Sequence, residues 1–448
     1  MLSKVLIANR GEIAVRIIRA CRELGLRTVA VFSEADRGAL HAQIADEAVC
    51  VGPAATKDSY LNISAILAAC ELTGADGIHP GFGFLSESPQ FANACRRCGV
   101  AFVGPNAESI EMMGDKARAK DTMKKAGVPV VPGSDGVVKT LEEAYEIADG
   151  IGYPVMVKAS AGGGGRGIRL VNDESGLENA IVAARQEALQ FFGNGEVYLE
   201  KFIVNPRHIE IQILADQHGN VVHLGERDCS LQRRNQKVLE EAPSPVMTEK
   251  LRARMGEAAV RAAKACGYWN AGTVEFLVDS ERNFYFMEMN TRIQVEHPVT
   301  ELVTGIDLVK QQLLIAGGEP LPFRQEEIRL TGHAIECRVN AENPKLGFRP
   351  SPGKITALHL PGGPGVRIDS AVYQGCEITP YYDNMIAKLI AYAPDREQAI
   401  MKMKWALAEF LVEGVDTNID FQLSLIRDPD FESADYDIGF LNRKDVMK

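Results

Sequence analysis

The chain has 448 residues, 46% of them hydrophobic and 24% charged, a composition typical of a folded protein with about three domains. Its net charge of −11 argues against nucleic acid or an anionic membrane as a partner bound through a general positive surface. No apolar run is long enough to cross a bilayer. Because the start MLSKVLIANRGE leads directly into a strand pattern, we expect no signal or transit segment. Nine cysteines without framework spacing favour a reducing, cytoplasmic location.

The first 114 residues alternate between strand and helix patterns. The predicted strands cover residues 5–8, 28–32, 77–79 and 101–103, and the predicted helices cover residues 12–24, 64–72 and 89–98. This alternation is typical of a parallel doubly wound sheet. The turn Asn9-Arg10-Gly11 lacks the second and third glycines of a dinucleotide fingerprint, so we expect this domain to be structural.

A glycine-rich segment follows a predicted helix at residues 116–126 and the linker Gly127-Val128-Pro129. In YPVMVKASAGGGGRG (residues 153–167), an apolar strand ends in Lys158 and four consecutive glycines follow. Glycine lets the backbone approach phosphate closely, successive N–H groups form an anion nest, and Lys158 adds a point charge. The spacing fits neither a Walker loop nor a dinucleotide motif, and a flexible turn is the alternative for a glycine run alone.

The most informative segment is NFYFMEMNTRIQVEHP (residues 283–298). We interpret it as one extended strand, because Pro298 disfavours helix at His297. Since side chains alternate along a strand, one face carries Glu288, Asn290, Arg292, Gln294 and Glu296. Such a row is suited to holding Mg²⁺ on phosphate oxygens, clamping a small anion and supplying a base.

A partner strand is predicted at residues 273–278, followed by a turn at residues 279–283. If the hairpin is centred between Glu281 and Arg282, Glu275 lies opposite Glu288. Facing like charges destabilise a strand pair, so we expect a cation between them, and Mg²⁺ suits oxygen ligands. The alternative is a solvated hairpin face with ordinary surface charges.

The glycine segment and FMEMNTRI together are similar to the signatures of ATP-grasp enzymes with a carbamoyl-phosphate-synthetase-like core. Longer strings resemble the biotin carboxylases: ANRGEIAVR (8–16), HPGFGFLS (79–86), RDCSLQRRNQKVLEEAP (227–243), RIQVEHPVT (292–300) and GHAIECRVN (332–340). The resemblance extends over the whole chain. It implies an α/β ATP-grasp fold with four parts: an N-terminal Rossmann-like (pre-ATP-grasp) domain (1–114), a linker helix (115–129), a mobile lid domain (130–203), and a catalytic and C-terminal α+β domain (204–448).

The resemblance also implies a role for individual residues. The ATP-binding residues are Lys116, Lys158, Gly164, Gly165, Glu200, Lys201, Ile203, His208, Gln232, Asn235, Glu275 and Glu288. The ligands of Mg²⁺ (or Mn²⁺) are Glu275, Glu288 and Asn290, and the bicarbonate pocket is Lys237, Arg292, Gln294, Val295 and Glu296. Catalysis is assigned to Glu296 as general base, with Arg292, Lys237 and Arg338, and biotin contacts to Arg338 and Phe82.

The implied reaction is ATP-dependent carboxylation of biotin by bicarbonate through carboxyphosphate. Biotin would arrive on a biotin carboxyl carrier protein, a carboxyltransferase would use the product, and the chain would form a homodimer. Family analogy favours the acetyl-CoA carboxylase of fatty acid synthesis, while propionyl-CoA and pyruvate systems remain open. Two positions depart from common family residues: Phe82, where tyrosine is frequent, and Asn235, where some members have histidine.

Other interpretations of the chain make different predictions. Another ATP-grasp ligase would not require biotin, and a catalytically silent nucleotide-binding regulator would lack a metal ligand or the base. The sequence Met401-Lys402-Met403 is similar to a biotin-attachment motif, but its apolar spacing predicts an amphipathic helix with Lys402 on the surface. The pair Cys95 and Cys98 lies at the end of a helical pattern, which disfavours a redox role.

Overall fold

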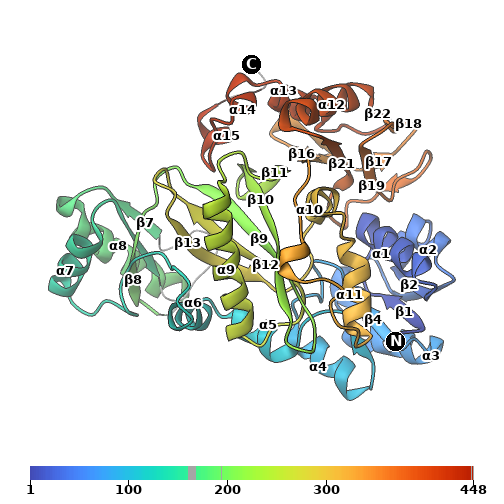
Figure 1. Ribbon diagram of the computed structural model, residues 1–448, viewed down its shortest axis with the longest axis horizontal. Coiled ribbons are helices and arrows are strands. Elements are labelled where there is room, and N and C mark those ends of the chain that lie inside the picture. Colours follow the sequence, from blue (N-terminus) through green and yellow to red (C-terminus); the bar gives the residue numbers. More distant parts are fainter. Residues whose placement is uncertain (160–167, 193, 445, 447–448) are drawn as a thin grey trace. The chain divides into compact units, whose positions relative to one another are not determined.

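The computed structural model describes residues 1–159, 168–192, 194–444 and 446 (Figure 1). The chain divides into two compact units. The larger unit contains Met1–Val128, Arg207–Phe276 and Glu288–Lys448, and the smaller unit contains Pro129–Pro206 with Leu277–Met287. Every helix in the described residues is too short or too polar to cross a bilayer.

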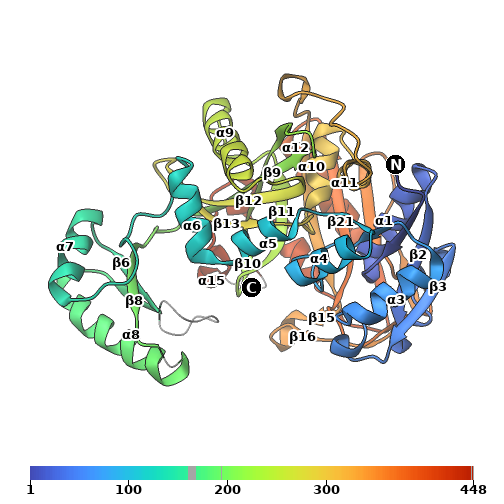
Figure 2. The same cartoon turned by 90° about the horizontal axis from the view of Figure 1, so that it is seen from below.

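The N-terminal segment of the larger unit forms a five-stranded parallel sheet in the order β3-β2-β1-β4-β5. Its strands are β1 (Lys4–Ile7), β2 (Arg27–Ser33), β3 (Glu47–Gly52), β4 (Gly77–His79) and β5 (Ala101–Phe102). Its helices are α1 (Gly11–Glu23), α2 (Leu40–Ile44), α3 (Ile63–Thr73), α4 (Pro89–Arg97), α5 (Ala107–Gly114) and α6 (Lys116–Lys125). Figure 2 shows α3 beside β2 and β3. The predicted parallel sheet is confirmed; β3 was not predicted, because this edge strand is mostly half-exposed and has no strong apolar pattern.

An eight-stranded sheet has the order β13-β12-β9-β10-β11-β14-β21-β19. These strands are β9 (Arg207–Ala215), β10 (Val221–Arg233), β11 (Gln236–Ala242), β12 (Asn270–Val278), β13 (Phe284–Asn290), β14 (His333–Asn340), β19 (Val366–Ser370) and β21 (Met385–Ala393). The helices of this part are α9 (Glu249–Ala265), α10 (His297–Thr304), α11 (Leu308–Ala316), α12 (Arg396–Glu409), α13 (Ile419–Ile426), α14 (Pro429–Glu432) and α15 (Phe440–Arg443).

Short strands complete the C-terminal part. They pair as β15 (Glu342–Asn343) with β16 (Arg349–Pro350), β17 (Gly353–Lys354) with β20 (Glu377–Ile378), and β18 (Ala357–His359) with β22 (Leu411–Glu413). A separate core lies between α1 and α11, which pack side by side (Figure 1). Ile293 is fully buried in this core and anchors the chain that follows β13.

Two local predictions are wrong. The strand at residues 283–298 ends at Asn290, and α10 begins at His297, because a proline in the first turn of a helix loses no hydrogen bond. The hairpin is centred on Glu281, not between Glu281 and Arg282: the Asp279 N–H donates to the Asn283 carbonyl, and Arg282 has φ +65°. A left-handed residue at the end of a three-residue loop is a common way to close a hairpin.

The smaller unit contains a three-stranded antiparallel sheet, β7-β6-β8. Its strands are β6 (Val155–Ala159), β7 (Ile168–Val171) and β8 (Val197–Lys201), and its helices are α7 (Leu141–Ile151) and α8 (Leu177–Phe192). Apolar residues of both helices and of the sheet form its own hydrophobic core. The predicted phosphate-loop residues Gly164 and Gly165 lie outside the described residues.

Candidate active site

The centre of the site is an ammonium group shared by three carboxylates. Lys237 Nζ, on β11, donates to Glu210 Oε2 at 2.6 Å, Glu296 Oε1 at 2.7 Å and Glu275 Oε1 at 2.9 Å. The three carboxylate side chains are at most 4% exposed. Burial alone would lower the pKa of Lys237, but the charges of Glu210 and Glu296 raise it well above its usual value. The ammonium is therefore permanently charged and neutralises one of the three carboxylates.

Glu296 lies between two cations. Its Oε1 accepts from Lys237, and its Oε2 accepts from Arg338 Nη2 at 2.9 Å. Arg338, on β14, also donates through Nε to Glu240 Oε1 at 2.7 Å. Burial alone would raise the pKa of Glu296, but Lys237, then Arg338, bring it well below its usual value. The carboxylate is thus ionised and able to accept a proton.

Arg292 and Gln294 link Asn290, the last residue of β13, to Glu275 of the carboxylate cluster. Arg292 Nη1 donates to Gln294 Oε1 at 2.6 Å, and its Nη2 donates to Asn290 Oδ1 at 2.9 Å. Gln294 Nε2 donates to Glu275 Oε1 at 2.9 Å. An amide and a guanidinium held in this way present several N–H groups to a small anion.

The predicted metal ligands provide a set of oxygen atoms suited to a hard cation. Glu275 and the half-buried Glu288 are close enough that, after burial, the charge of Glu275 contributes most to raising the pKa of Glu288. A divalent cation shared by these two carboxylates would relieve that repulsion, so the residues fit Mg²⁺ or Mn²⁺. Asn290 donates its amide N–H to Glu275 at 2.9 Å, which places its side chain beside the same carboxylate.

His208 and Gln232 extend the network beyond Glu275. His208 Nε2 lies 2.9 Å from Glu275 Oε2, and its Nδ1 lies 2.8 Å from Gln232 Nε2. The charge of Lys116, at the start of α6, lowers the pKa of the nearby Glu288. Nine predicted residues therefore form one continuous set of contacts: His208, Gln232, Lys237, Glu275, Asn290, Arg292, Gln294, Glu296 and Arg338.

The remaining predicted residues lie in different surroundings. In the smaller unit, Lys158 Nζ donates to Glu200 Oε2 at 2.5 Å, Lys201 Nζ donates to the Gly152 carbonyl at 2.9 Å, and Ile203 is buried. Asn235 is exposed at the tip of the β10–β11 turn, where it has φ +64°. Asparagine tolerates this conformation better than most residues, so its identity there has a backbone explanation.

Phe82 lies in the loop that follows β4. Its carbonyl accepts from Asn9 Nδ2 at 2.8 Å, and its ring packs on the core around α1 and α11. Later in the same loop, Glu87 Oε2 accepts from Arg292 Nε at 3.0 Å, and Glu87 Oε1 accepts from the Thr291 N–H at 3.1 Å. The loop that carries Phe82 thus reaches the candidate site through Glu87.

Three acidic residues of the site were not predicted from the sequence. Glu87 and Glu240 gave no local signal, because their partners lie about 100 to 200 residues away in the chain. Glu210 could have been found: in β9, the alternation of apolar residues with His208, Glu210 and Gln212 places these three on one face. Arg227 is fully buried and donates to Glu210 and Gln212, so it has a structural role in this cluster.

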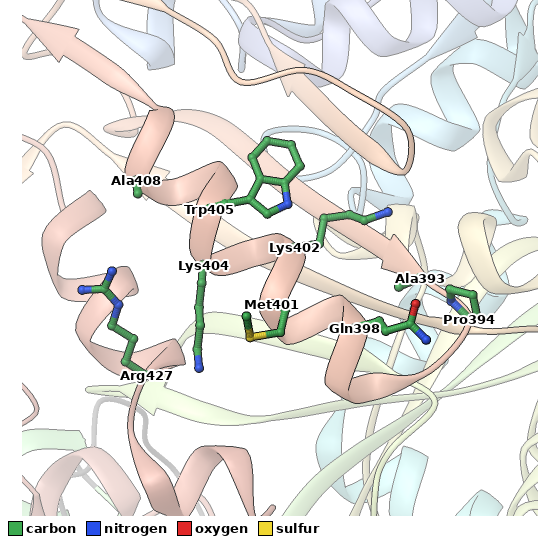
Figure 3. A pocket seen from close by; sticks show the side chains of 9 residues that line it. All are labelled: Ala393, Pro394, Gln398, Met401, Lys402, Lys404, Trp405, Ala408 and Arg427. Carbon is green, nitrogen blue, oxygen red and sulfur yellow. The ribbon is translucent and has the colours of Figure 1, made fainter.

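Lys402 lies on α12, as predicted, and not on a hairpin turn. Its ammonium donates to the carbonyls of Pro364 at 2.7 Å and Tyr392 at 2.8 Å. Figure 3 shows Lys402 with Met401 and Trp405 along this helix, beside a cavity of about 660 Å³. The nine cysteines are free thiols; Cys95 is buried and Cys98 is exposed at the end of α4.

Comparisons with known proteins agree with this geometry. Residues 115–324 match the family described as carbamoyl-phosphate synthase L chain, ATP binding domain. Residues 1–110 match the biotin carboxylase N-terminal domain, and residues 336–443 match the biotin carboxylase C-terminal domain. The fold and the site define an ATP-grasp ligase.

Relatives similar over nearly the whole chain identify the family within this class of ligases. Biotin carboxylase 1 of Bacillus subtilis is 58% identical over 448 residues, all of both chains. A pyruvate carboxylase subunit of Methanothermobacter thermautotrophicus is 55% identical over 99% of this chain and 90% of its own. A solved biotin carboxylase domain dimer of Hydrogenobacter thermophilus 2-oxoglutarate carboxylase, in complex with MgADP, ADP and bicarbonate, has a TM-score of 0.89 at 53% identity and covers 99% and 98% of the two chains. The chain belongs to the biotin carboxylase family.

Proposed function

We propose that the cluster around Lys237 binds bicarbonate and ATP, and that Glu296 is the general base that starts carboxylation of biotin. The observation that carries this proposal is the position of the Glu296 carboxylate, 2.7 Å from Lys237 Nζ and 2.9 Å from Arg338 Nη2. Lys237, Arg292 and Gln294 supply the N–H groups for the anion. Val295 has an apolar side chain, so its contribution is a backbone N–H.

The proposed chemistry begins with a proton transfer. Glu296 takes the bicarbonate proton while a bicarbonate oxygen attacks the γ-phosphorus of ATP, and the bond from that phosphorus to ADP breaks. When Lys237 turns toward the bound anion, Glu296 loses its nearest cation. Its pKa then rises, which improves it as a proton acceptor. Glu275, Glu288 and Asn290 would hold Mg²⁺ or Mn²⁺, which would neutralise charge on the phosphates.

The product of this step, carboxyphosphate, decomposes to CO₂ and phosphate. Phosphate takes the N1′ proton of biotin, and the biotin nitrogen bonds to CO₂ to give carboxybiotin. Arg338 stabilises the enolate oxygen of biotin by a charge-assisted hydrogen bond, and Phe82 contributes an apolar contact near the same end. The smaller unit acts as a lid: it carries the nucleotide contacts Lys158, Glu200, Lys201 and Ile203, and it excludes water from carboxyphosphate.

The biological setting is the second part of the proposal. We assign the chain to an acetyl-CoA carboxylase of fatty acid synthesis, as a cytoplasmic homodimer served by a biotin carboxyl carrier protein and a carboxyltransferase. The similarity to chains from a pyruvate carboxylase and from a 2-oxoglutarate carboxylase keeps other acceptors as alternatives. Carboxylation of purified carrier proteins from each system, compared by initial rate, distinguishes them, and light scattering tests the dimer.

The test of the reaction is ATP hydrolysis by the purified chain with Mg²⁺ and bicarbonate, with and without free biotin. We expect strong stimulation by biotin that is lost in Glu296→Ala and Arg338→Ala. Lys402→Arg is the matched control, because its ammonium lies on α12 and donates to backbone carbonyls there. Turnover that does not respond to biotin, or that responds to another carboxylate or amine, would identify a different ATP-grasp ligase.

A further inference from the structure

The segment at residues 291–296, which carries Arg292, Gln294 and Glu296, has no regular secondary structure. Its backbone groups therefore lack the ladder of hydrogen bonds that fixes a strand or helix. Ile293 anchors one side chain in the core of α1 and α11, but this does not orient the peptide planes. Within the segment, Arg292 Nη1 donates to the Ile293 carbonyl at 3.2 Å. The Gln294 carbonyl accepts from the His297 N–H at 3.3 Å.

Two consecutive carbonyls of the segment accept hydrogen bonds from buried side chains. His297 Nδ1 lies 2.8 Å from the Gln294 carbonyl oxygen, and Lys388 Nζ lies 2.9 Å from the Val295 carbonyl oxygen. Both side chains are 0% exposed. Burial, and then the charge of Lys388, lower the pKa of His297 well below its usual value, so its neutral ring donates through Nδ1–H.

The position of Lys388 in the sheet explains why its ammonium contacts the Val295 carbonyl. Lys388 on β21 is the register partner of Arg338 on β14 and of Asp369 on β19, so the three side chains share one sheet face. Arg338 contacts the Glu296 carboxylate, and Lys388 contacts the carbonyl of the preceding residue. One sheet face thus holds two consecutive residues of the catalytic segment.

The charge of Lys388 is balanced away from the substrate pocket. Its ammonium lies 3.2 Å from Glu12 Oε1, in the first turn of α1, and 3.7 Å from Asp369 Oδ2. Both carboxylates form ion pairs with Lys388, and the same ammonium donates a hydrogen bond to the Val295 carbonyl. One of these carboxylates is enough to balance the charge, and the hydrogen bond to Val295 is separate from both ion pairs.

In a trans peptide the carbonyl and the N–H point in opposite directions. A Gln294 carbonyl held by His297 therefore directs the Val295 N–H the other way, and a Val295 carbonyl held by Lys388 directs the Glu296 N–H likewise. We infer that Lys388 and His297 are positioning residues that aim the peptide N–H groups of Val295 and Glu296, and with them the Glu296 carboxylate, at bicarbonate. This inference rests on the proposed function of Glu296 and deepens it.

The test is steady-state kinetics of biotin-stimulated ATP turnover, with bicarbonate and ATP varied separately in degassed buffer. Lys388→Met removes the donor at similar volume. We expect its KM for bicarbonate to rise about tenfold and its KM for ATP to stay within about twofold, the effect of one lost hydrogen bond to an oriented group. Lys388→Arg, which keeps a donor and the charge, should recover part of the bicarbonate affinity.

Glu12→Gln is the matched control for a merely structural effect. It removes one of the two ion pairs of Lys388 but leaves Asp369 and the contact to Val295, so we expect a lower unfolding temperature and an unchanged KM for bicarbonate. If Lys388→Met does not fold, His297→Asn and His297→Leu provide the same comparison at the other peptide, because asparagine can replace the Nδ1 donor and leucine cannot. Leucine should then raise the KM for bicarbonate about tenfold over asparagine.

The outcomes separate this inference from the proposed function. If the wild-type chain shows no biotin-stimulated turnover, the proposed function is wrong. If the wild type turns over and Lys388→Met, or His297→Leu where Lys388→Met does not fold, keeps the wild-type KM for bicarbonate, the positioning role is wrong. Equal losses of bicarbonate affinity in Lys388→Met and Glu12→Gln would also overturn it, since both would then reflect general destabilisation.

Discussion

Glu240 and Glu241 are neighbours on β11, yet they belong to buried clusters of opposite character. Because side chains alternate along a strand, Glu240 points toward Arg338 and Glu296, and Glu241 points toward the C-terminal helices. Glu241 accepts from His333 Nε2 at 2.6 Å, from Arg396 Nε at 2.7 Å and from the Tyr436 hydroxyl. One carboxylate there has three donors.

On the other face, each cation is shared between carboxylates. Glu210, Glu275 and Glu296 share Lys237, while Glu240 and Glu296 share Arg338. Burial raises the pKa of Glu240 to about 7, in spite of Arg338. Burial alone would also raise the pKa of Glu241, but the hydrogen bond from His333 and the charge of Arg396 lower it to about 2. The fully hydrogen-bonded Glu241 stabilises the fold, whereas the shared cations around Glu240 and Glu296 suit the proposed binding of a metal ion and a reacting anion.

The largest predicted effect is on catalysis. Glu296→Gln keeps the volume and removes the proton acceptor, so we expect biotin-dependent ADP release to fall by about 10² to 10⁴, the usual contribution of a general base. The unfolding temperature should change little in comparison. A variant with more than a tenth of wild-type kcat would contradict the role of Glu296 as the base.

The next prediction tests the contrast between the two neighbours directly. Glu241→Gln removes a buried charge that His333 and Arg396 require, and it should lower the free energy of unfolding by about 3 kcal/mol. Glu240→Gln at pH 6 should cost much less, because a pKa of about 7 leaves this carboxyl mostly protonated and similar to an amide. Chemical denaturation at pH 6 measures both. Equal costs would mean that the clusters do not differ as described.

A third prediction concerns the metal. Glu288→Gln removes one negative charge from the oxygen set that would bind Mg²⁺, so the Mg²⁺ concentration for half-maximal ATP turnover should rise about tenfold. Asp279→Asn, in the hairpin turn next to the same strand pair, is the control and should leave it unchanged. A shift of the same size in both variants would point to a change in the hairpin and not in the metal site.

A fourth prediction extends the comparison to a buried base. Burial lowers the pKa of His41 from 6.5 to about 4. Between these values the unfolded chain binds a proton that the folded chain does not, so His41 has no effect of this kind above about pH 6.5 and destabilises the fold increasingly as the pH falls toward 4. In His41→Gln, the slope of unfolding free energy against pH should fall by about 1.4 kcal/mol per pH unit in this window. An unchanged slope would contradict a neutral buried His41.

The smallest predicted effect is at Lys402 on α12, which lies in the sequence similar to a biotin-attachment motif. Lys402→Arg should keep biotin-stimulated turnover and change the free energy of unfolding by less than about 0.5 kcal/mol, as for most surface substitutions. Mass spectrometry after incubation with a biotin protein ligase should find no biotin on Lys402 in the wild type. Biotin at this position would show that the helix, and not a separate carrier, provides the attachment site.

The sequence predicted the parts of this molecule that depend on local patterns. The parallel sheet follows from alternating strands and helices, and Asn290, Arg292, Gln294 and Glu296 were found together because they lie within seven residues. The path of that segment was predicted wrongly, since a proline two residues after Glu296 is compatible with a helix start as well as with a strand.

Other features depend on distant contacts that no local pattern encodes. Lys388 and Val295 are 93 residues apart, and Glu87 and Arg292 are 205 apart. Such pairs meet only after the sheet order is fixed, and the order β11-β14-β21 joins strands separated by long connections. The opposite surroundings of Glu240 and Glu241 follow from the same order, because each face of β11 is covered by a different part of the chain.

The most direct test of the central claim follows an oxygen atom. The purified chain is incubated with MgATP, free biotin and ¹⁸O-labelled bicarbonate, and the released phosphate is analysed by ³¹P NMR for the isotope shift. If bicarbonate attacks the γ-phosphorus within the cluster of Lys237 and Glu296, the phosphate carries an oxygen from bicarbonate. Phosphate without label, with its new oxygen from water, would contradict the carboxyphosphate route and the assignment of Glu296 as the base that activates bicarbonate.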